Sequence, residues 1–334
     1  MKKVIKKYDI TQCAIYKCKS QRKLESLLRL GKYDLNRIGN AIRYHAFKIE
    51  KSGTNETRDI TAPCLNLKLI QKRILRLIER VNRPLWLISG EKGKCYIDNG
   101  KVHLLSSYVL TVDIKKFYDN CKREPVFRFF RDYLKTSDDI AGILADIVTY
   151  KGGIPTGCPT SQLIAYYAYQ KMFEEINRVA CQYGCIFTLY VDDMTFSSIE
   201  PFASDKLAND IDIVLRKFGH KPKYCKVKYY SKKDPKPITG TIVSPSHRLE
   251  VPNKLQKRAY ENFQDIKKCR NNKSNIHNFE SIVLSLKGQL QAISNIDPNK
   301  FPEIQRMTKH LKFTLNNLPH SNAKKRVIIA RKRT

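Results

Sequence analysis

The residues that point most directly to catalysis are two adjacent aspartates, Asp192 and Asp193, within the segment IFTLYVDDMTFSS. Apolar and β-branched residues on both sides predict two short strands, with the acidic pair at the turn between them. Adjacent carboxylates repel each other, and Asp is a poor strand residue, so the pair does not serve stability. Because hard oxygen ligands favour Mg²⁺, this pattern predicts a divalent-cation site.

A third carboxylate, Asp113, ends another apolar strand, predicted in the segment YVLTVDI. If this strand lies beside the predicted hairpin, Asp113 can project over the same site as Asp192 and Asp193. Each element taken alone also fits an ordinary acidic turn, because Asp is common in turns. The three carboxylates together favour a catalytic centre.

The spacing of these residues resembles two palm motifs of reverse transcriptases. Asp113 ends a strand, and Asp192, 79 positions later, belongs to a Tyr-x-Asp-Asp hairpin. The resemblance implies nucleotidyl transfer with two metal ions, expected to be Mg²⁺ with Mn²⁺ as the alternative. Asp113 and Asp192 would bridge both ions, and Asp193 would be a weaker ligand or an electrostatic support. The resemblance also places Tyr190 near the primer and template.

The loop Gly153–Ser161 (GIPTGCPTS) lies between the two acidic elements and resembles the Pro-x-Gly-x-Pro-x-Ser loop of the same family. Taken alone it is a Pro- and Gly-rich turn. The resemblance implies that Thr156 and Gly157 contact the nucleotide and that Pro155 and Ser161 contact the primer or template. We expect Gly157 to let the backbone approach a base pair closely, because glycine has no side chain.

An aromatic residue five positions after Asp113, Tyr118, stands where the family carries the ring that excludes a ribose 2′-hydroxyl. Such a ring selects deoxynucleotides by steric clash. The neighbouring Phe117 is the competing candidate, and a place in the core is the alternative role for Tyr118. The resemblance favours Tyr118 as the sugar gate.

Basic residues resemble two further family positions. Arg58, in ETRDITAP, matches the fingers arginine that clamps the triphosphate, and Lys51 could assist it. Lys226 best matches the lysine of the fourth palm motif, a candidate acid for the departing pyrophosphate. Lys223 and Lys228 compete for that role, because basic residues are common throughout this chain.

Two outer motifs point to the retron subgroup of the family. The segment Pro237–Val243 (PITGTIV) resembles the Val-Thr-Gly motif, which suggests that Thr239 and Gly240 meet the primer or template at a strand bend. The segment NGKVH resembles the Asn-Ala-x-x-His motif with Gly in place of Ala, and implies the same contact for Asn99 and His103. His103 by itself would be a hydrogen-bonded structural histidine.

The elements that must position these residues follow from hydrophobic periodicity. Residues 1–50 are predicted to be a basic helical N-terminal region that includes LESLLRLGKYDLNRIGNAIRYHAF. The resemblance implies that residues 51–103, with part of 120–160, form the fingers of a right-hand polymerase fold. Residues 104–245 alternate strand and helix signals, which predicts an α+β domain built around a sheet, and the resemblance implies that this domain is the palm.

Four segments in particular are predicted to be helical. LNLKLIQKRILRLIERV is expected to be helical, with one apolar face formed by Leu69, Ile70, Ile74, Leu75 and Ile78. A helix-like stretch is expected from Glu124 to Tyr150. LQKRAYENFQDIKKC and FESIVLSLKGQLQAI are expected to be amphipathic helices near the C-terminus.

Charge points to a polyanionic partner. The 334 residues include 63 Lys and Arg against 31 Asp and Glu, a formal net charge of +32. Residues 246–334 hold 19 basic and 6 acidic residues and are predicted to form a helical thumb and basic tail. We expect Lys254, Lys257 and Arg258 to contact the template–product duplex there. Charge alone does not distinguish such a protein from a ribosomal-type protein.

The cysteines do not suggest a zinc site or disulfides, and the apolar segments do not suggest a membrane span. The ten cysteines lack finger-like spacing, so we interpret them as reduced thiols rather than a zinc site or disulfide frame. No stretch approaches the ~20 apolar residues of a membrane span. The start of the chain is basic but lacks the apolar core of a secretory signal. We therefore expect a cytoplasmic protein with no membrane partner.

The retron resemblance implies particular partners. Retron enzymes copy a structured non-coding RNA into branched, RNA-linked single-stranded DNA, usually in phage defence with an effector protein. The expected partners are therefore that RNA, its DNA product, dNTPs and an effector. Alternatives are a diversity-generating or stand-alone bacterial reverse transcriptase, a catalytically silent RNA-binding scaffold that would lose its carboxylates, and an RNA-dependent RNA polymerase with Gly-Asp-Asp at the hairpin.

Overall fold

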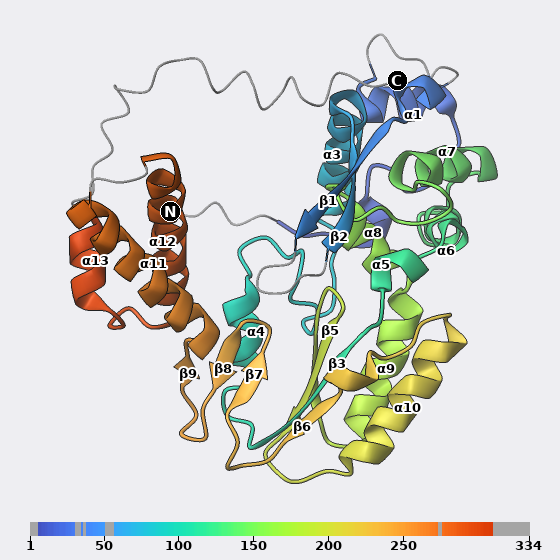
Figure 1. Ribbon diagram of the computed structural model, residues 1–334. Coiled ribbons are helices and arrows are strands. Elements are labelled where there is room, and N and C mark those ends of the chain that lie inside the picture. The colour runs from blue at the N-terminus through green and yellow to red at the C-terminus, as the bar shows by residue number, and fades with distance from the viewer. Residues whose placement is uncertain (1–5, 31–34, 36–37, 51–56, 273–275, 310–334) are drawn as a thin grey trace. The chain divides into compact units, whose positions relative to one another are not determined.

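The strands predicted around the acidic residues are neighbours in one four-stranded antiparallel sheet (Figure 1). β3 (Tyr108–Asp113) pairs with β5 (Asp193–Ser198), which also pairs with β4 (Ile186–Tyr190). β6 (Lys228–Tyr230) lies on the other side of β3. The prediction of an α+β domain built around a sheet is confirmed.

The computed structural model describes residues 6–30, 35, 38–50, 57–272 and 276–309. The chain forms two compact units, residues 1–250 and residues 251–334. The sheet and the three aspartates belong to the first unit.

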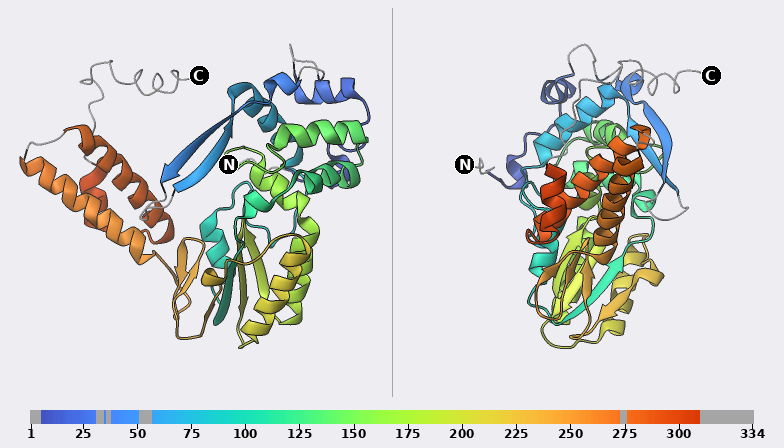
Figure 2. Two further views of the ribbon diagram at one scale, coloured as in Figure 1. Left: turned by 45° about the vertical axis from the view of Figure 1, so that its right-hand side comes forward. Right: turned by 60° about the vertical axis from the view of Figure 1, so that its left-hand side comes forward.

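Two amphipathic helices, α9 (Gln170–Gln182) and α10 (Ser204–Lys217), pack side by side against one face of the sheet (Figure 2). Successive strand residues point to opposite faces. Leu110 and Val112 of β3 therefore enter the core, where each is 2% exposed. Thr111 and Asp113 are left for the opposite face.

The rest of the first unit is mainly helical, and its apolar faces join the same core. Removing such apolar surface from water stabilises a fold by roughly 25 cal/mol per Å². The elements are η1 (Ile10–Gln12), α1 (Gln21–Leu28), α2 (Ile38–Ala41), α3 (Leu65–Ile78), α5 (Phe117–Asn120), α6 (Arg123–Arg128), the π-helical turn η3 (Phe129–Tyr133), α7 (Asp138–Val148), α8 (Ser161–Ala168) and the 3₁₀ turn η4 (Tyr224–Lys226).

The prediction that residues 1–50 are helical is wrong for Tyr44–Glu50, which form strand β1. β1 pairs in antiparallel register with β2 (Thr57–Pro63) along its whole length. The Tyr44 ring also lies 4.4 Å from the Tyr150 ring, centroid to centroid. Long-range pairing and packing override a weak local helical preference here.

Two other helix predictions need correction. α3 buries Ile70, Ile74 and Ile78, but Leu69 is 57% exposed and is not part of the buried face. The stretch from Glu124 to Tyr150 is interrupted after η3, because Lys135 adopts a left-handed φ of 53° before α7 begins. That conformation ends a helix.

A small antiparallel sheet carries the segment Pro237–Val243, which resembles the Val-Thr-Gly motif. It consists of β7 (Lys236–Ile238), β8 (Thr241–Val243) and β9 (Leu249–Glu250), and β8 contacts α4 (Tyr96–Val102). The β7–β8 turn is Thr239–Gly240, with φ of 40° and 85°. Two-residue hairpin turns require positive φ, which glycine adopts easily and threonine does not.

The second unit is helical, as predicted for both C-terminal segments. It contains α11 (Asn253–Asn272), α12 (Ile276–Ile296) and α13 (Pro302–Lys309). Its separate core includes Phe263 and Ile266 of α11, which pack with Leu286 and Ile293 of α12.

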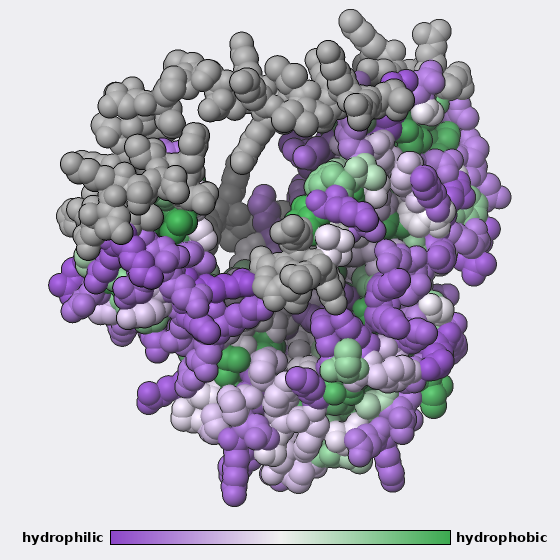
Figure 3. Space-filling model, in the orientation of Figure 1, coloured by the Kyte–Doolittle hydropathy of each residue, from purple (hydrophilic) through white to green (hydrophobic). Residues whose placement is uncertain are grey.

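The face of the molecule drawn in the space-filling view is predominantly polar. Figure 3 shows hydrophilic residues over most of the coloured face, with hydrophobic residues in small separate groups. Among the described helices, none has both the length and the apolarity needed to cross a membrane. The described cysteines are all free thiols.

Candidate active site

The register of the sheet brings two of the three predicted carboxylates together. Asp113, the last residue of β3, is the direct partner of Asp193, the first residue of β5. Asp192 lies in the adjoining β4–β5 turn, and its carbonyl oxygen accepts a hydrogen bond from the Ile114 N–H at 3.1 Å. The strand end and the hairpin tip therefore form one site, as predicted from their sequence pattern.

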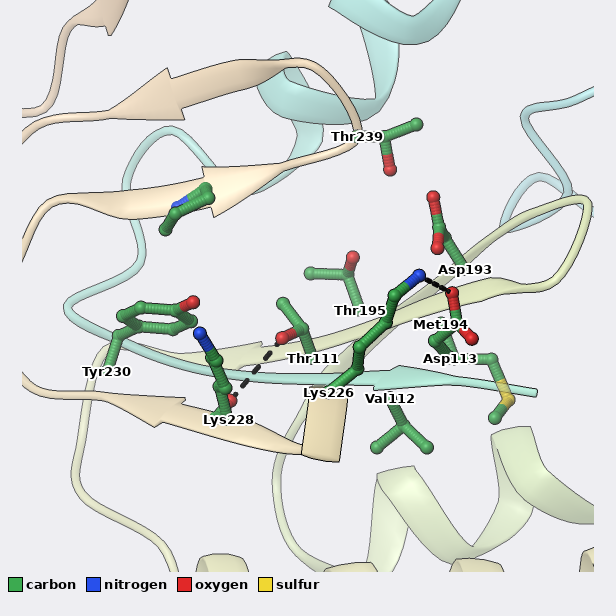
Figure 4. Close-up of a pocket in the computed structure, with 11 residues that line it drawn as sticks. Thr111, Val112, Asp113, Asp193, Met194, Thr195, Lys226, Lys228, Tyr230 and Thr239 are labelled. Carbon is green, nitrogen blue, oxygen red and sulfur yellow. Dashed lines mark hydrogen bonds and ion pairs between the residues drawn. The ribbon is translucent and has the colours of Figure 1, made fainter. Parts of the chain in front are cut away.

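A pocket of about 210 Å³ opens beside this pair (Figure 4). Its walls come from the polar face of the four-stranded sheet, from Lys226 at the end of η4 and from the β7–β8 hairpin. The lining residues are Thr111, Val112, Asp113, Asp193, Met194, Thr195, Lys226, Lys228, Tyr230, Pro237 and Thr239.

Some of these lining residues were missed by the sequence analysis. Thr111 and Thr195 lie two positions from Asp113 and Asp193 on their strands, and residues two apart share a face of a sheet. That alternation could have identified them. Tyr230 carries no comparable signal, because only the pairing of β6 with β3 brings it to the pocket.

Backbone hydrogen bonds place one lysine against Asp113. The Asp113 carbonyl accepts from the Lys223 N–H at 2.7 Å, which fixes the start of the turn η4. η4 ends at Lys226, whose Nζ lies 2.5 Å from Asp113 Oδ2. Of the three lysines that competed as sequence candidates, Lys226 forms this ion pair, while Lys228 lines the pocket farther along β6.

The site has an unbalanced charge. Burial, with the neighbouring charges of Asp192 and Asp113, raises the pKa of Asp193 to about 6. Burial acts to lower the pKa of Lys226, but its hydrogen bond and charge attraction to Asp113 outweigh this and the pKa is raised. The carboxylates therefore repel one another, and a cation between them would relieve that repulsion.

The donor chemistry fits a divalent cation, because carboxylate oxygens are the hard ligands that Mg²⁺ prefers. Within the described residues, however, no three His, Cys, Asp or Glu side chains are arranged as a ready-made metal site. The Asp113 carboxylate is turned to Lys226 instead. A metal ion bound by Asp113 would therefore lie beside the Lys226 ammonium.

The structure separates the two candidates for the sugar gate. Phe117 is 3% exposed and packs against the rings of Tyr169, Phe173 and His220, so it is a core residue. Tyr118 is half-buried at the edge of the same core.

The loop Gly153–Ser161 is fixed to β2 by Gly157, whose N–H donates to the Thr61 carbonyl at 2.9 Å. A Cβ on Gly157 would lie 2.6 Å from that oxygen, so β2 already requires the glycine that we expected to face a base pair. The Thr156 hydroxyl donates to the Asp59 carbonyl at 3.3 Å. This loop and β2 thus form one structural piece.

Two residues of this loop do not reach solvent. Ser161 is 2% exposed and its hydroxyl donates to the Pro155 carbonyl, while Pro155 is itself buried. The prediction that both contact primer or template directly needs correction, because burial leaves them to hold the loop in shape.

Asn99 and His103 are likewise buried, each 0% exposed, which contradicts direct contact with primer or template. Asn99 Nδ2 donates to Thr239 Oγ1 at 2.9 Å and so ties α4 to the hairpin that lines the pocket. His103 bonds Ser197 Oγ at 2.6 Å and Thr188 Oγ1 at 2.7 Å. The two retron-like motifs therefore meet in the structure.

Glycine at position 100, where the motif usually has alanine, also has a structural reason. A Cβ there would lie 2.4 Å from Thr241 Oγ1. Thr241 is buried, and its hydroxyl donates to the Ile238 carbonyl at 2.9 Å. The β8 side chain occupies the space that alanine would need.

Other sequence candidates lie elsewhere. Lys51 is outside the described residues, and Arg58 is described only as part of the β2 backbone. Lys254 and Lys257 are exposed on α11 in the second unit. Tyr190 ends β4, directly before the turn that carries Asp192, and Gly240 is exposed beside Thr239.

Comparison with known proteins identifies relatives of this chain. The family model described as reverse transcriptase (RNA-dependent DNA polymerase) matches residues 49–243, which is more than half of the chain. That range contains β2, the loop bonded to it, all three aspartates and the β7–β8 hairpin.

Individual relatives are retron proteins. The retron Se72 reverse transcriptase of Salmonella heidelberg (strain 579083-10) is 28% identical over 176 residues, 52% of this chain and 46% of that protein. The retron Ec86 reverse transcriptase of Escherichia coli is 29% identical over 158 residues, 47% and 49% of the two chains. The retron Ec83 reverse transcriptase of Escherichia coli is 26% identical over 227 residues, 63% and 72%. The chain thus spans about half the length of the first two relatives. It belongs to the reverse transcriptase family and, within it, is similar to the retron enzymes.

Proposed function

We propose that this protein is an RNA-directed DNA polymerase that copies a cognate structured non-coding RNA into single-stranded DNA, as a retron reverse transcriptase. The observation that carries the proposal is the register that pairs Asp113 with Asp193 and sets Asp192 in the adjoining turn. A cluster of carboxylates beside an open pocket, in which the pKa of Asp193 is raised, is expected where charge must be managed during reaction.

Asp113 and Asp192 would hold two Mg²⁺ ions, with Asp193 as a weaker ligand or electrostatic support. When bound, these ions would activate the primer hydroxyl and neutralise charge on the triphosphate. Lys226 keeps a protonated ammonium in the same pocket, since its pKa is raised. From there it can donate a proton to the departing pyrophosphate.

The surrounding elements have matching roles in the proposal. Tyr118 is the sugar gate, since Phe117 is committed to the core. Residues 51–103, with part of 120–160, act as fingers, 104–245 as the palm and 246–334 as the thumb. The bonds between the loop Gly153–Ser161 and β2 support a continuous surface from fingers to palm. Arg58 and Lys51 would clamp the triphosphate.

The retron assignment rests on the relatives and on the two outer motifs that meet at Asn99 and Thr239. We propose a structured RNA as template and primer, a branched RNA–DNA product, and an effector protein in phage defence. The net charge of +32 is consistent with a nucleic-acid partner.

Primer extension tests the polymerase. Purified protein, a primed RNA template, the four dNTPs and Mg²⁺ should give DNA extended to the template end, and a chelator should stop the reaction. Incorporation of ribonucleotides in preference to dNTPs, or no extension with several primers, would contradict the proposal.

The nucleic acid that co-purifies with the protein tests the retron assignment. Sequencing it should reveal one dominant structured RNA joined through a 2′–5′ linkage to DNA. Unbranched cDNA from a template repeat would indicate a diversity-generating enzyme instead, and unselected RNA without DNA would indicate an RNA-binding scaffold.

A further inference from the structure

The turn that carries Asp192 has a backbone conformation that its sequence does not favour. Val191 has a φ of 62°, in the left-handed region. β-branched residues seldom adopt this region, because the side chain crowds the backbone. Such strain persists only where the surroundings hold it in place.

Ser89 provides a direct hold on this peptide. Its hydroxyl oxygen accepts a hydrogen bond from the Val191 N–H at 2.8 Å, and the residue is 4% exposed. On the other side of the turn, the Ile114 N–H donates to the Asp192 carbonyl. The turn is thus held by the Ser89 side chain at Val191 and by the Ile114 backbone N–H at Asp192.

The residues before Ser89 are fixed to the edge of the sheet. Leu87 bridges Leu189 of β4 in parallel. The Ile88 N–H donates to the Leu189 carbonyl at 3.0 Å, and the Leu189 N–H donates to the Trp86 carbonyl at 2.9 Å. This segment therefore moves with the strand that leads into the catalytic turn.

The residues after Ser89 are fixed as well. Gly90, with a φ of 72°, turns the chain beside the Gln162 side chain of α8. Glu91 is 7% exposed and accepts hydrogen bonds from Lys7 and Arg83. Because both flanks are anchored, the Ser89 hydroxyl occupies a defined position.

We infer that Ser89 is a positioning residue for the catalytic turn: its hydroxyl holds the Val191 peptide in the left-handed conformation and thereby orients the Asp192 carboxylate. The inference rests on the proposed function for the role of Asp192. Ser89 belongs to none of the family-like motifs, and the Ser-Gly pair in the sequence signals only a turn.

The test replaces the hydroxyl and measures both the turn and the reaction. Ser89→Ala should speed hydrogen exchange of the Val191 amide, which loses its acceptor. It should also lower kcat on a primed RNA template by about ten- to a hundredfold, because small misplacements of reacting groups have effects of this size. The KM for dNTP should change much less.

Ser106→Ala is the matched control. Ser106 is also a buried serine, 3% exposed, but its hydroxyl bonds Ser197 rather than the turn. This variant should leave kcat and exchange at Val191 close to wild type, while thermal unfolding reports any general loss of stability in either variant.

A second variant separates positioning from folding. Val191→Gly removes the steric cost of a positive φ, so the turn needs less support. Adding Ser89→Ala to Val191→Gly should therefore lower kcat less than Ser89→Ala does in the wild-type background.

Two results would overturn the inference: unchanged amide exchange and kcat in Ser89→Ala, or equal losses of kcat in the two backgrounds. If the wild-type protein synthesised no DNA, the proposed function would fail, but the exchange measurement would still decide whether Ser89 holds the turn.

Discussion

At the residue scale, backbone geometry decides which of several similar side chains meets Asp113. By sequence, Lys226 matches the family position best, and Lys223 and Lys228 compete with it. The hydrogen bond from the Lys223 N–H to the Asp113 carbonyl sets the turn η4 so that Lys226 reaches the Asp113 carboxylate. The same ion pair raises the pKa of Lys226, although burial opposes it, and so keeps it protonated.

Lys226→Ala should therefore slow single-turnover nucleotide addition by about 10²-fold or more, the usual contribution of a general acid. Lys228→Ala is the control, because Lys228 lines the same pocket without the ion pair to Asp113. Rapid-quench measurement at saturating dNTP provides the rates. A larger loss in the Lys228 variant would move the acid role to that residue.

Alanine substitutions at Tyr118 and at its neighbour Phe117 should have different effects. Tyr118→Ala should admit ribonucleotides far more readily and leave the protein folded. Phe117→Ala should instead destabilise the fold by about 3–5 kcal/mol, as truncation of a buried phenylalanine does. Single-nucleotide extension with dNTP or rNTP, together with denaturant unfolding, measures both. Unchanged sugar discrimination in the Tyr118 variant would remove it as the gate.

At the element scale, buried polar bonds hold the helix α4 against two sheets. Asn99 reaches Thr239 in the β7–β8 turn, and His103 bonds Thr188 of β4 and Ser197 of β5. Buried polar groups need such partners, because an unmet hydrogen bond in the core is unfavourable. Two motifs far apart in the sequence thus act as one support for the pocket wall.

Sequence patterns predicted the elements whose signal is local. The strand–turn–strand around Asp192 and the helices α11 and α12 have clear periodicity, and they are present. Burial of Asn99 was not predictable, because it depends on a hairpin about 140 residues away. Strand β1 was missed because its pairing with β2, the next strand along the chain, outweighs local preference.

The buried His103 should make the free energy of unfolding depend on pH. Burial lowers the pKa of His103 from 6.5 to about 3 in the folded state. Between these values the unfolded chain binds a proton that the folded chain excludes. The stabilisation is therefore full above pH 6.5 and decreases as the pH falls toward 3.

Between pH 7.5 and pH 5.0 this residue should account for a loss of roughly 2 kcal/mol in the free energy of unfolding. His103→Gln should show a shallower dependence on pH, although it is less stable at pH 7.5. The pKa of His220 is lowered to about 4 by burial and by Lys122, so His220 should preserve part of the pH dependence in the His103→Gln variant. Urea unfolding at the two pH values measures it, and identical slopes in variant and wild type would contradict the account.

At the scale of the whole molecule, catalysis and nucleic-acid affinity should be separable. The aspartates lie in the first unit, whereas residues 246–334 carry 19 basic and 6 acidic residues. The second unit has its own core formed by α11 and α12. Removing exposed charge from α11 should therefore leave its fold intact.

Replacing Lys254, Lys257 and Arg258 together with alanine should weaken RNA binding and flatten its salt dependence. Each lost phosphate contact should reduce the log–log salt slope by about one unit. Fluorescence anisotropy over a salt series measures the slope, and single-turnover chemistry at saturating RNA should change much less. Lost chemistry with an intact salt slope would mean that these residues do not form a nucleic-acid clamp.

The most direct test of the central claim compares DNA synthesis by the wild-type protein with that of Asp113→Asn and Asp192→Asn on one primed RNA template. Each substitution keeps the side-chain shape but removes a charged ligand from the proposed metal site. We predict that both lower the single-turnover rate by about 10³-fold or more, because a two-metal site loses several kcal/mol of transition-state stabilisation. RNA affinity should remain near wild type in both variants. Near-normal primer extension by either variant would contradict the assignment of these aspartates as the catalytic centre.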